Sequence, residues 1–166
     1  AFSRFAAMMA AHFEGRVSHF ITLNEPQIVL KLGYADGIHA PGKRLSLPEL
    51  VSCWKNLMLA HGLSFRAIRK AAPEALIGIA STGKLCYPHS PADEDAARQE
   101  TFRLTDSDWM FTHAIVLDAV CLGRDEPEAG ALRKLLSEVT PEEWDTMHAV
   151  PDFIGVNSYN GSEIAA

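Results

Sequence analysis

The stretch HFITLNEPQI, residues 19–28, contains the features that decide the fold. The β-prone run Val17–Leu23 predicts a short buried strand, and Pro26 prevents its simple continuation because proline has no N–H to donate to a neighbouring strand. Asn24 and Glu25 therefore lie where the strand ends. A carboxylate at that point either caps the turn that follows or belongs to a functional site.

Two further apolar runs predict strands over Leu76–Ala80 and Phe153–Val156. Between the first two predicted strands, Ser46–Ala72 carries apolar residues at i, i+3, i+4 and i+7, the pattern of an amphipathic helix. Ser46 and Glu49 form the S-x-x-E pattern of a capping box at its start. The sequence thus predicts a strand, a long helix and a second strand in succession.

Periodic apolar residues and turn-forming residues define the rest of the chain. The other helices that periodicity predicts lie at residues 1–13, Asp93–Leu104, Asp108–Leu122 and from Thr140 onward. We expect Asp106 or Ser107 to cap the helix over Asp108–Leu122. Residues 31–45 and 81–95 are rich in glycine, proline and polar residues, which predicts two long loops.

Strands that alternate with helices indicate an α/β fold built from parallel βαβ units. Two architectures meet this description, a doubly wound open sheet and part of a (β/α)8 barrel. No glycine-rich phosphate-binding fingerprint follows a predicted strand, which counts against a nucleotide-binding sheet. Because the chain opens inside a helical pattern and closes just after a strand, we expect it to be a segment of a larger fold.

Composition narrows the classes of function. The 166 residues carry a formal net charge of −6, which gives no electrostatic case for nucleic-acid binding. No apolar run reaches the roughly 20 residues of a membrane span, and the N-terminal stretch is expected to be an amphipathic helix, not a signal peptide. We therefore expect no nucleic-acid partner and no membrane partner.

The cysteine pattern suggests neither a metal site nor a disulfide framework. Cys53, Cys86 and Cys121 are widely spaced and odd in number, so we expect reduced, largely buried thiols and a cytoplasmic location. His89 and His113 have no ligand partner at metal-binding spacing. The sequence implies no metal and no organic cofactor.

Polar side chains follow each predicted strand. Asn24 and Glu25 end the first strand, Ser81 and Thr82 follow the second, and the sequence NSY, residues 157–159, follows the third. In parallel α/β folds these strand ends share one face, where binding sites form. Amides, a carboxyl group and a phenol at that face suit a polyhydroxylated ligand, because an amide both donates to and accepts from sugar hydroxyls.

These motifs resemble those of the family 1 glycoside hydrolases, the β-glucosidase-like enzymes. RVSHFITLNEP (16–26) is similar to the fourth barrel strand with its T-x-N-E-P signature, and GYADGIHAPG (33–42) to the loop after it. LMLAHGLSFRAIR (57–69) resembles the next helix, IGIA (77–80) the fifth strand, and DFIGVNSYNG (152–161) the sixth. The resemblance covers almost the whole chain and implies a partial (β/α)8 TIM barrel, roughly strands four to six, within a single domain.

The resemblance implies a role for four residues. Glu25 corresponds to the general acid/base of a retaining β-glycosidase, and Asn24 to the amide that binds the sugar 2-hydroxyl. Asn157 and Tyr159 correspond to residues that line the sugar site, the tyrosine lying close to the nucleophile. Gln27 stands where the family often has tryptophan, which is expected to alter the aglycone side. A glutamate at position 25, where the thioglucosidase branch has glutamine, favours O-linked β-glycosides as the small carbohydrate substrate.

The resemblance also shows what the 166 residues lack. Retaining hydrolysis needs a second carboxylate as nucleophile, and the family's T-E-N-G motif is absent. Glu163 is a poor candidate for the nucleophile because it lies in a loop and belongs to no such motif. Asp152 precedes its strand and therefore lies at the end of the barrel opposite to the site. We expect the chain to need the remaining barrel segments or self-association, since three strands cannot close a barrel. The alternative is a catalytically inactive partial barrel that binds sugar weakly or serves in assembly.

Several other residues have simpler explanations. Trp54 and His61 lie on the apolar stripe of the long helix and are expected to pack in the core. Trp109 and Trp144 are expected to anchor outer helices to the barrel. His39 lies in the loop after Glu25, where it either lines the pocket or lies on the protein surface. The preferred sugar is left open by the sequence, with glucose, galactose, fucose and 6-phospho sugars as alternatives.

Overall fold

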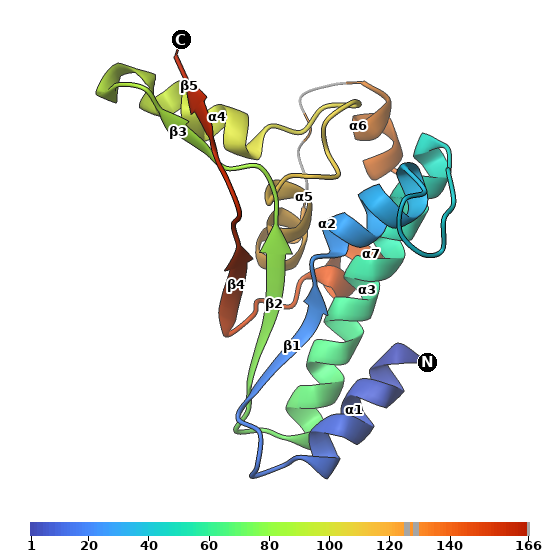
Figure 1. Ribbon diagram of the computed structural model, residues 1–166. Helices are drawn as coiled ribbons and strands as arrows, with labels where there is room; N and C mark the ends of the chain where they lie inside the picture. Colours follow the sequence, from blue (N-terminus) through green and yellow to red (C-terminus); the bar gives the residue numbers. More distant parts are fainter. Residues whose placement is uncertain (125–126, 128–129, 166) are drawn as a thin grey trace.

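The computed structural model describes residues 1–124, 127 and 130–165. Its centre is a parallel three-stranded sheet with the order β1-β2-β4 (Figure 1). The strands are β1 (His19–Asn24), β2 (Leu76–Thr82), β3 (Cys86–Pro88), β4 (Phe153–Asn157) and β5 (Ser162–Ile164). The three predicted strands are therefore confirmed as β1, β2 and β4, neighbours in space as they are in sequence.

Helices connect the strands of the sheet and gather on one side of it (Figure 1). The α-helices are α1 (Phe2–His12), α2 (Pro26–Ile28), α3 (Leu47–Ala71), α4 (Glu94–Phe102), α5 (Ala114–Leu117), α6 (Ala131–Leu136) and α7 (Pro141–Met147). Two π-helical segments, η1 (Val29–Ala35) and η3 (Asp118–Leu122), and the 3₁₀ turn η2 (Pro91–Asp93) complete them. Parallel strands joined through helices are the arrangement that the sequence predicts.

The long helix α3 forms as its sequence predicts. The Glu49 carboxylate accepts hydrogen bonds from the backbone N–H of Ser46 at 2.9 Å and from its hydroxyl at 2.6 Å, which completes the capping box. These two hydrogen bonds hold the pKa of Glu49 below its ordinary value. Trp54 and His61 are fully buried on the inner face of the helix, so their predicted packing roles are confirmed.

The main core lies between α3, β2 and the segment from α5 to α7. Ile79 in the central strand is fully buried, and the Trp54 indole N–H donates to the carbonyl of Ile115 at 2.7 Å. Trp144 of α7 packs edge-on against Trp54, with ring centroids 5.8 Å apart. Trp109 is also buried, although it lies in the loop before α5 and not on a helix as expected.

Three predictions about local structure are wrong. The expected loop over residues 31–45 begins inside η1, and the expected loop over residues 81–95 contains β3. β3 pairs with β5 in a separate two-stranded parallel sheet, beyond the ends of β2 and β4 (Figure 1). The helix expected over Asp108–Leu122 begins only at Ala114.

The expected cap of that helix serves a different helix. The Asp106 carboxylate accepts from the backbone N–H groups of Ala131 at 2.9 Å and Leu132 at 2.8 Å, so it caps α6. These hydrogen bonds lower the pKa of Asp106. A side chain on one loop thus satisfies the free N–H groups of a helix some 25 residues further along.

Several large apolar side chains of the outer strands face solvent. Ile21 of β1 is 50% exposed, and Ile154 and Val156 of β4 are 43% and 61% exposed. β1 and β4 each pair on one side only within the described residues. None of the described helices combines the length and apolar character needed to cross a membrane.

Candidate active site

Glu25 lies directly after β1, at the carboxyl end of the sheet. Its backbone N–H donates to the carbonyl of Ala80 in β2 at 2.9 Å, so the sheet fixes the residue at its N-terminal side. Pro26 then starts α2, a position that proline tolerates because the first helical N–H has no partner. Glu25 itself has φ 49° and ψ 56°, the left-handed region.

The structure brings together the four residues that the resemblance singled out. The Asn157 amide donates to Glu25 Oε1 at 2.7 Å and to Asn24 Oδ1 at 3.2 Å. The Tyr159 hydroxyl donates to the same Glu25 oxygen at 3.0 Å. Glu25 and Asn157 are half-buried, whereas Tyr159 is 81% exposed. β1 and β4 are not neighbours in the sheet, so these contacts cross over the end of β2.

The contacts give the two carboxylate oxygens of Glu25 different environments. Both donors reach Oε1, and among the described residues no donor reaches Oε2. The hydrogen bond to the Glu25 carboxylate, with its negative charge, raises the pKa of the Tyr159 phenol. Tyr159 therefore stays protonated and acts as a donor to Glu25. The expected approach of Tyr159 to a nucleophile stays a prediction.

The end of β2 supports the neighbouring strand. The Thr82 hydroxyl donates to the backbone carbonyl of Asn157 at 3.1 Å, and Thr82 is almost fully buried. This contact fixes the backbone from which the Asn157 amide reaches Glu25. Thr82 was noted in the sequence only as a polar strand end, and its register opposite Asn157 follows from strand pairing that no local pattern specifies.

Gln27 lies inside the chain, and its expected effect on the aglycone side stays a prediction. Its side chain is fully buried within the chain and donates to the Ser81 hydroxyl at 2.7 Å and to the Thr112 carbonyl at 3.3 Å. Ser81 in turn contacts Nδ1 of His113 at 2.9 Å. Burial lowers the pKa of His113, so this imidazole favours its neutral form.

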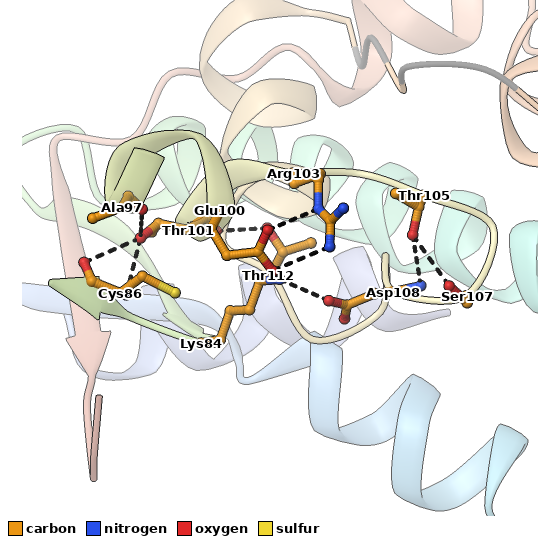
Figure 2. A network of polar contacts seen from close by, with 10 residues as sticks. All are labelled: Lys84, Cys86, Ala97, Glu100, Thr101, Arg103, Thr105, Ser107, Asp108 and Thr112. Atoms are coloured by element: carbon orange, nitrogen blue, oxygen red, sulfur yellow. Dashed lines mark hydrogen bonds and ion pairs between the residues drawn. The ribbon is translucent and has the colours of Figure 1, made fainter. Parts of the chain in front are cut away.

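A cluster of charges braces the segment that leads to His113. Figure 2 shows Lys84, just after β2, reaching Glu100 at 2.6 Å and Asp108 at 2.7 Å. Arg103 pairs with Glu100 from the other side. Burial by itself would lower the pKa of Lys84, but its hydrogen bonds to the two carboxylates outweigh that effect and raise the pKa. The cluster therefore fastens α4 and the loop before α5 to the end of β2.

The other candidate residues lie elsewhere. Asp152 accepts from the backbone N–H of Ile77 at 2.7 Å and pairs with Arg69, at the opposite end of β2 from Glu25, as predicted. Glu163 contacts His89 at 3.1 Å across the β3–β5 sheet, and His39 is exposed. Within the described ranges no group of three His, Cys, Asp or Glu side chains could hold a metal ion.

His61 has hydrogen-bond partners on both ring nitrogens. Nδ1 lies 2.7 Å from the Thr22 hydroxyl in β1, and Nε2 lies 3.0 Å from the carbonyl of Ala149 before β4. Burial lowers its pKa. The ring therefore joins α3 to β1 and to the segment that precedes β4.

Comparison with known proteins identifies the family. The family model described as Glycosyl hydrolase family 1 matches residues 1–166. The chain belongs to this family. Beta-glucosidase A of Thermotoga maritima is 28% identical over 164 residues, covering 96% of this chain and 35% of that protein. Beta-glucosidase 16 of Arabidopsis thaliana is 32% identical over 177 residues, covering 96% of this chain and 33% of that protein.

Solved structures show the same relation. The virulence factor SghA of Agrobacterium tumefaciens, in complex with its substrate analogue salicin, superposes with a TM-score of 0.78 at 27% identity. The match covers 99% of this chain and 35% of that one. The chain thus spans about a third of the length of its relatives, and its sheet is part of the fold of the family 1 glycoside hydrolases.

Proposed function

We propose that this chain supplies the acid/base half of a retaining β-glycosidase site of the β-glucosidase type, acting on O-linked β-glycosides. The observation that carries the proposal is the convergence of Asn157 and Tyr159 on one carboxylate oxygen of Glu25. In this proposal β1, β2 and β4 are the fourth, fifth and sixth strands of the barrel. The nucleophile lies outside the 166 residues.

The geometry supports different roles for the two oxygens of the Glu25 carboxyl group. With Oε1 held by two donors, Oε2 is the oxygen that carries the exchangeable proton. Glu25 would first protonate the oxygen of the departing aglycone and then remove a proton from the water that releases the sugar. Asn24, which accepts from the Asn157 amide through Oδ1, keeps its own NH₂ group available for a sugar hydroxyl.

The proton-transfer role predicts a dependence on the leaving group. We would insert residues 1–166 in place of the matching segment of Thermotoga maritima Beta-glucosidase A and measure hydrolysis of aryl β-glucosides. General acid catalysis contributes about 10²–10⁴-fold, so Glu25→Gln should lower kcat/KM by that order for poor leaving groups. A strongly acidic phenol needs no proton, so its release should suffer far less.

The matched control is Glu163→Gln, which removes an exposed carboxylate near the same end of the sheet. It should leave the leaving-group dependence unchanged. Equal losses for all leaving groups in Glu25→Gln, or none, would refute the acid/base role. Comparing glucosides, galactosides, fucosides and 6-phosphoglucosides in the same assay would choose among the sugars.

The exposed apolar side chains of β1 and β4 favour a second candidate function. Within the described residues β1 and β4 are open edges of the three-stranded sheet, and Ile154 and Val156 are exposed. These features suit a partial barrel that assembles with other segments or binds sugar weakly. Sedimentation of the purified chain and calorimetric titration with glucose test this. A stable monomer that binds no sugar would refute it.

A further inference from the structure

We propose that Gln27 is a positioning residue. With Ser81 and His113 it forms a buried, hydrogen-bonded support, called here the Gln27 support, which holds the backbone of Glu25 in its unusual conformation. The proposal deepens the proposed function of Glu25 and rests on it for its catalytic meaning. The structural part of the proposal is that the Gln27 support sets the contact between Glu25 and Asn157. That contact can be measured without an enzymatic reaction.

The backbone of Glu25 needs such a support. Among the described residues, Glu25 is the one non-glycine residue with positive φ. The left-handed region brings Cβ close to the following carbonyl oxygen, so a residue with a side chain adopts it only where its surroundings impose it. The same backbone angles aim the Glu25 carboxyl group at Asn157 and Tyr159.

The two sides of Glu25 are held by different means. On the N-terminal side its own N–H bonds to Ala80 in β2. On the C-terminal side Pro26 has no N–H to donate, so the next group able to hold the chain to the sheet is the side chain of Gln27. That carboxamide is fully buried and contacts Ser81 at 2.7 Å, one residue after Ala80 on the same strand.

The hydrogen bonds of the Gln27 support have a definite direction. Gln27 Nε2 donates to Ser81 Oγ, and its Oε1 accepts from the backbone N–H of Thr82 at 3.5 Å. The Ser81 hydroxyl hydrogen then goes to Nδ1 of His113, the other partner of that oxygen. This direction requires Nδ1 to be unprotonated, so His113 takes the neutral form with the hydrogen on Nε2.

The far wall of the support is itself fixed. The carbonyl of Thr112 accepts from Gln27 Nε2 at 3.3 Å, and the adjacent carbonyl of Phe111 accepts from the backbone N–H of Lys84 at 3.1 Å. The charge cluster around Lys84 holds the same segment through Asp108 (Figure 2). Gln27 therefore connects α2 to a segment that other contacts hold in place. A side chain that only filled space would not need these hydrogen bonds.

The experiment follows the Asn157 side-chain amide by ¹⁵N–¹H NMR in the 166-residue chain as pH changes. In the unaltered chain its two signals should shift with pH, and Glu25→Gln should abolish that shift. Gln27→Met keeps the length of the side chain but cannot form the hydrogen bonds, and Ser81→Ala removes the middle of the support. Each should lose most of the Glu25-dependent shift.

The control is Thr22→Val, which removes a buried hydroxyl of β1 that contacts His61 and takes no part in the Gln27 support. It should keep the full shift. Variants that unfold cooperatively yet keep the shift would overturn the proposal, as would its absence in the unaltered chain. If Gln27→Met does not fold, Ser81→Ala decides by the same criteria. Shifts as expected in the 166-residue chain, together with turnover of the chimeric enzyme that Glu25→Gln leaves unchanged for every leaving group, would refute the catalytic role and keep the support.

Discussion

Gly62 of α3 lies where α7 approaches most closely, and Gly62→Ala should show how tightly the two helices are joined. A Cβ at Gly62 would lie 1.8 Å from the carbonyl oxygen of Thr146. An ordinary carbon–oxygen contact is about 3.3 Å or more, so α7 would have to move by about 1.5 Å. That movement would break the hydrogen bond from Arg66 Nη1 to the same oxygen, now 2.6 Å long.

The expected cost can be estimated from opposing effects. Overpacking of this kind costs about 1–3 kcal/mol, and each hydrogen bond lost from Arg66 adds up to about 1 kcal/mol. Alanine is the better helix former by about 1 kcal/mol, which offsets part of the loss. We therefore expect Gly62→Ala to lower the free energy of unfolding by about 1–3 kcal/mol.

The assay is urea unfolding followed by far-UV circular dichroism, with Ser64→Ala as the matched control. Ser64 is fully buried two residues further along α3, and within the described residues its hydroxyl has no hydrogen-bond partner. Removing an unpaired buried hydroxyl while improving helix propensity should leave stability unchanged or raise it by up to about 1 kcal/mol. Gly62→Ala as stable as the unaltered chain would refute the reasoning.

Three further predictions concern titration and capping. Burial lowers the pKa of His61, so the unfolded chain binds a proton that the folded chain resists. Stability should therefore fall as pH drops below about 6.5, seen as a lower melting temperature at pH 5.5 than at pH 7.5; equal values would contradict it. Asp106→Ala removes the cap of α6 and should lower the urea midpoint more than Asp106→Asn, which keeps one acceptor oxygen; the reverse order would argue against the cap. Glu25→Gln should lower the pKa of Tyr159 in an ultraviolet titration taken against Tyr159→Phe, and an unchanged value would contradict their contact.

The sequence predicted the parts of the fold that depend on neighbouring residues. The capping box of Ser46 and Glu49 spans four residues, and the strand before Glu25 ends at a proline, so both could be found by local patterns. Asp106 shows the limit of such patterns. It has the composition of a helix cap, but the N–H groups that it satisfies are those of Ala131 and Leu132.

In the candidate site, too, some features could be predicted from the sequence and others could not. Glu25, Asn157 and Tyr159 were predicted to meet because parallel strands end at one face, and their contacts are in the structure. The buried contacts of Gln27 could not be predicted from local patterns, because its partners Ser81 and Thr112 are more than 50 residues away in sequence. The pairing of β3 with β5 escaped prediction because each strand has only three residues.

The order of the strands has a consequence for the reach of Glu25. β2 lies between the two strands whose ends meet, so their backbones are separated by about twice the 4.8 Å spacing of adjacent strands. The side chains close that gap from both strands: the Asn157 amide reaches Asn24 at 3.2 Å and the carboxylate of Glu25 at 2.7 Å. The Asn157 amide, bonded to both Asn24 and Glu25, thereby acts as a tie across the sheet. Any outward swing of β4 would release the carboxylate without altering a residue of β1.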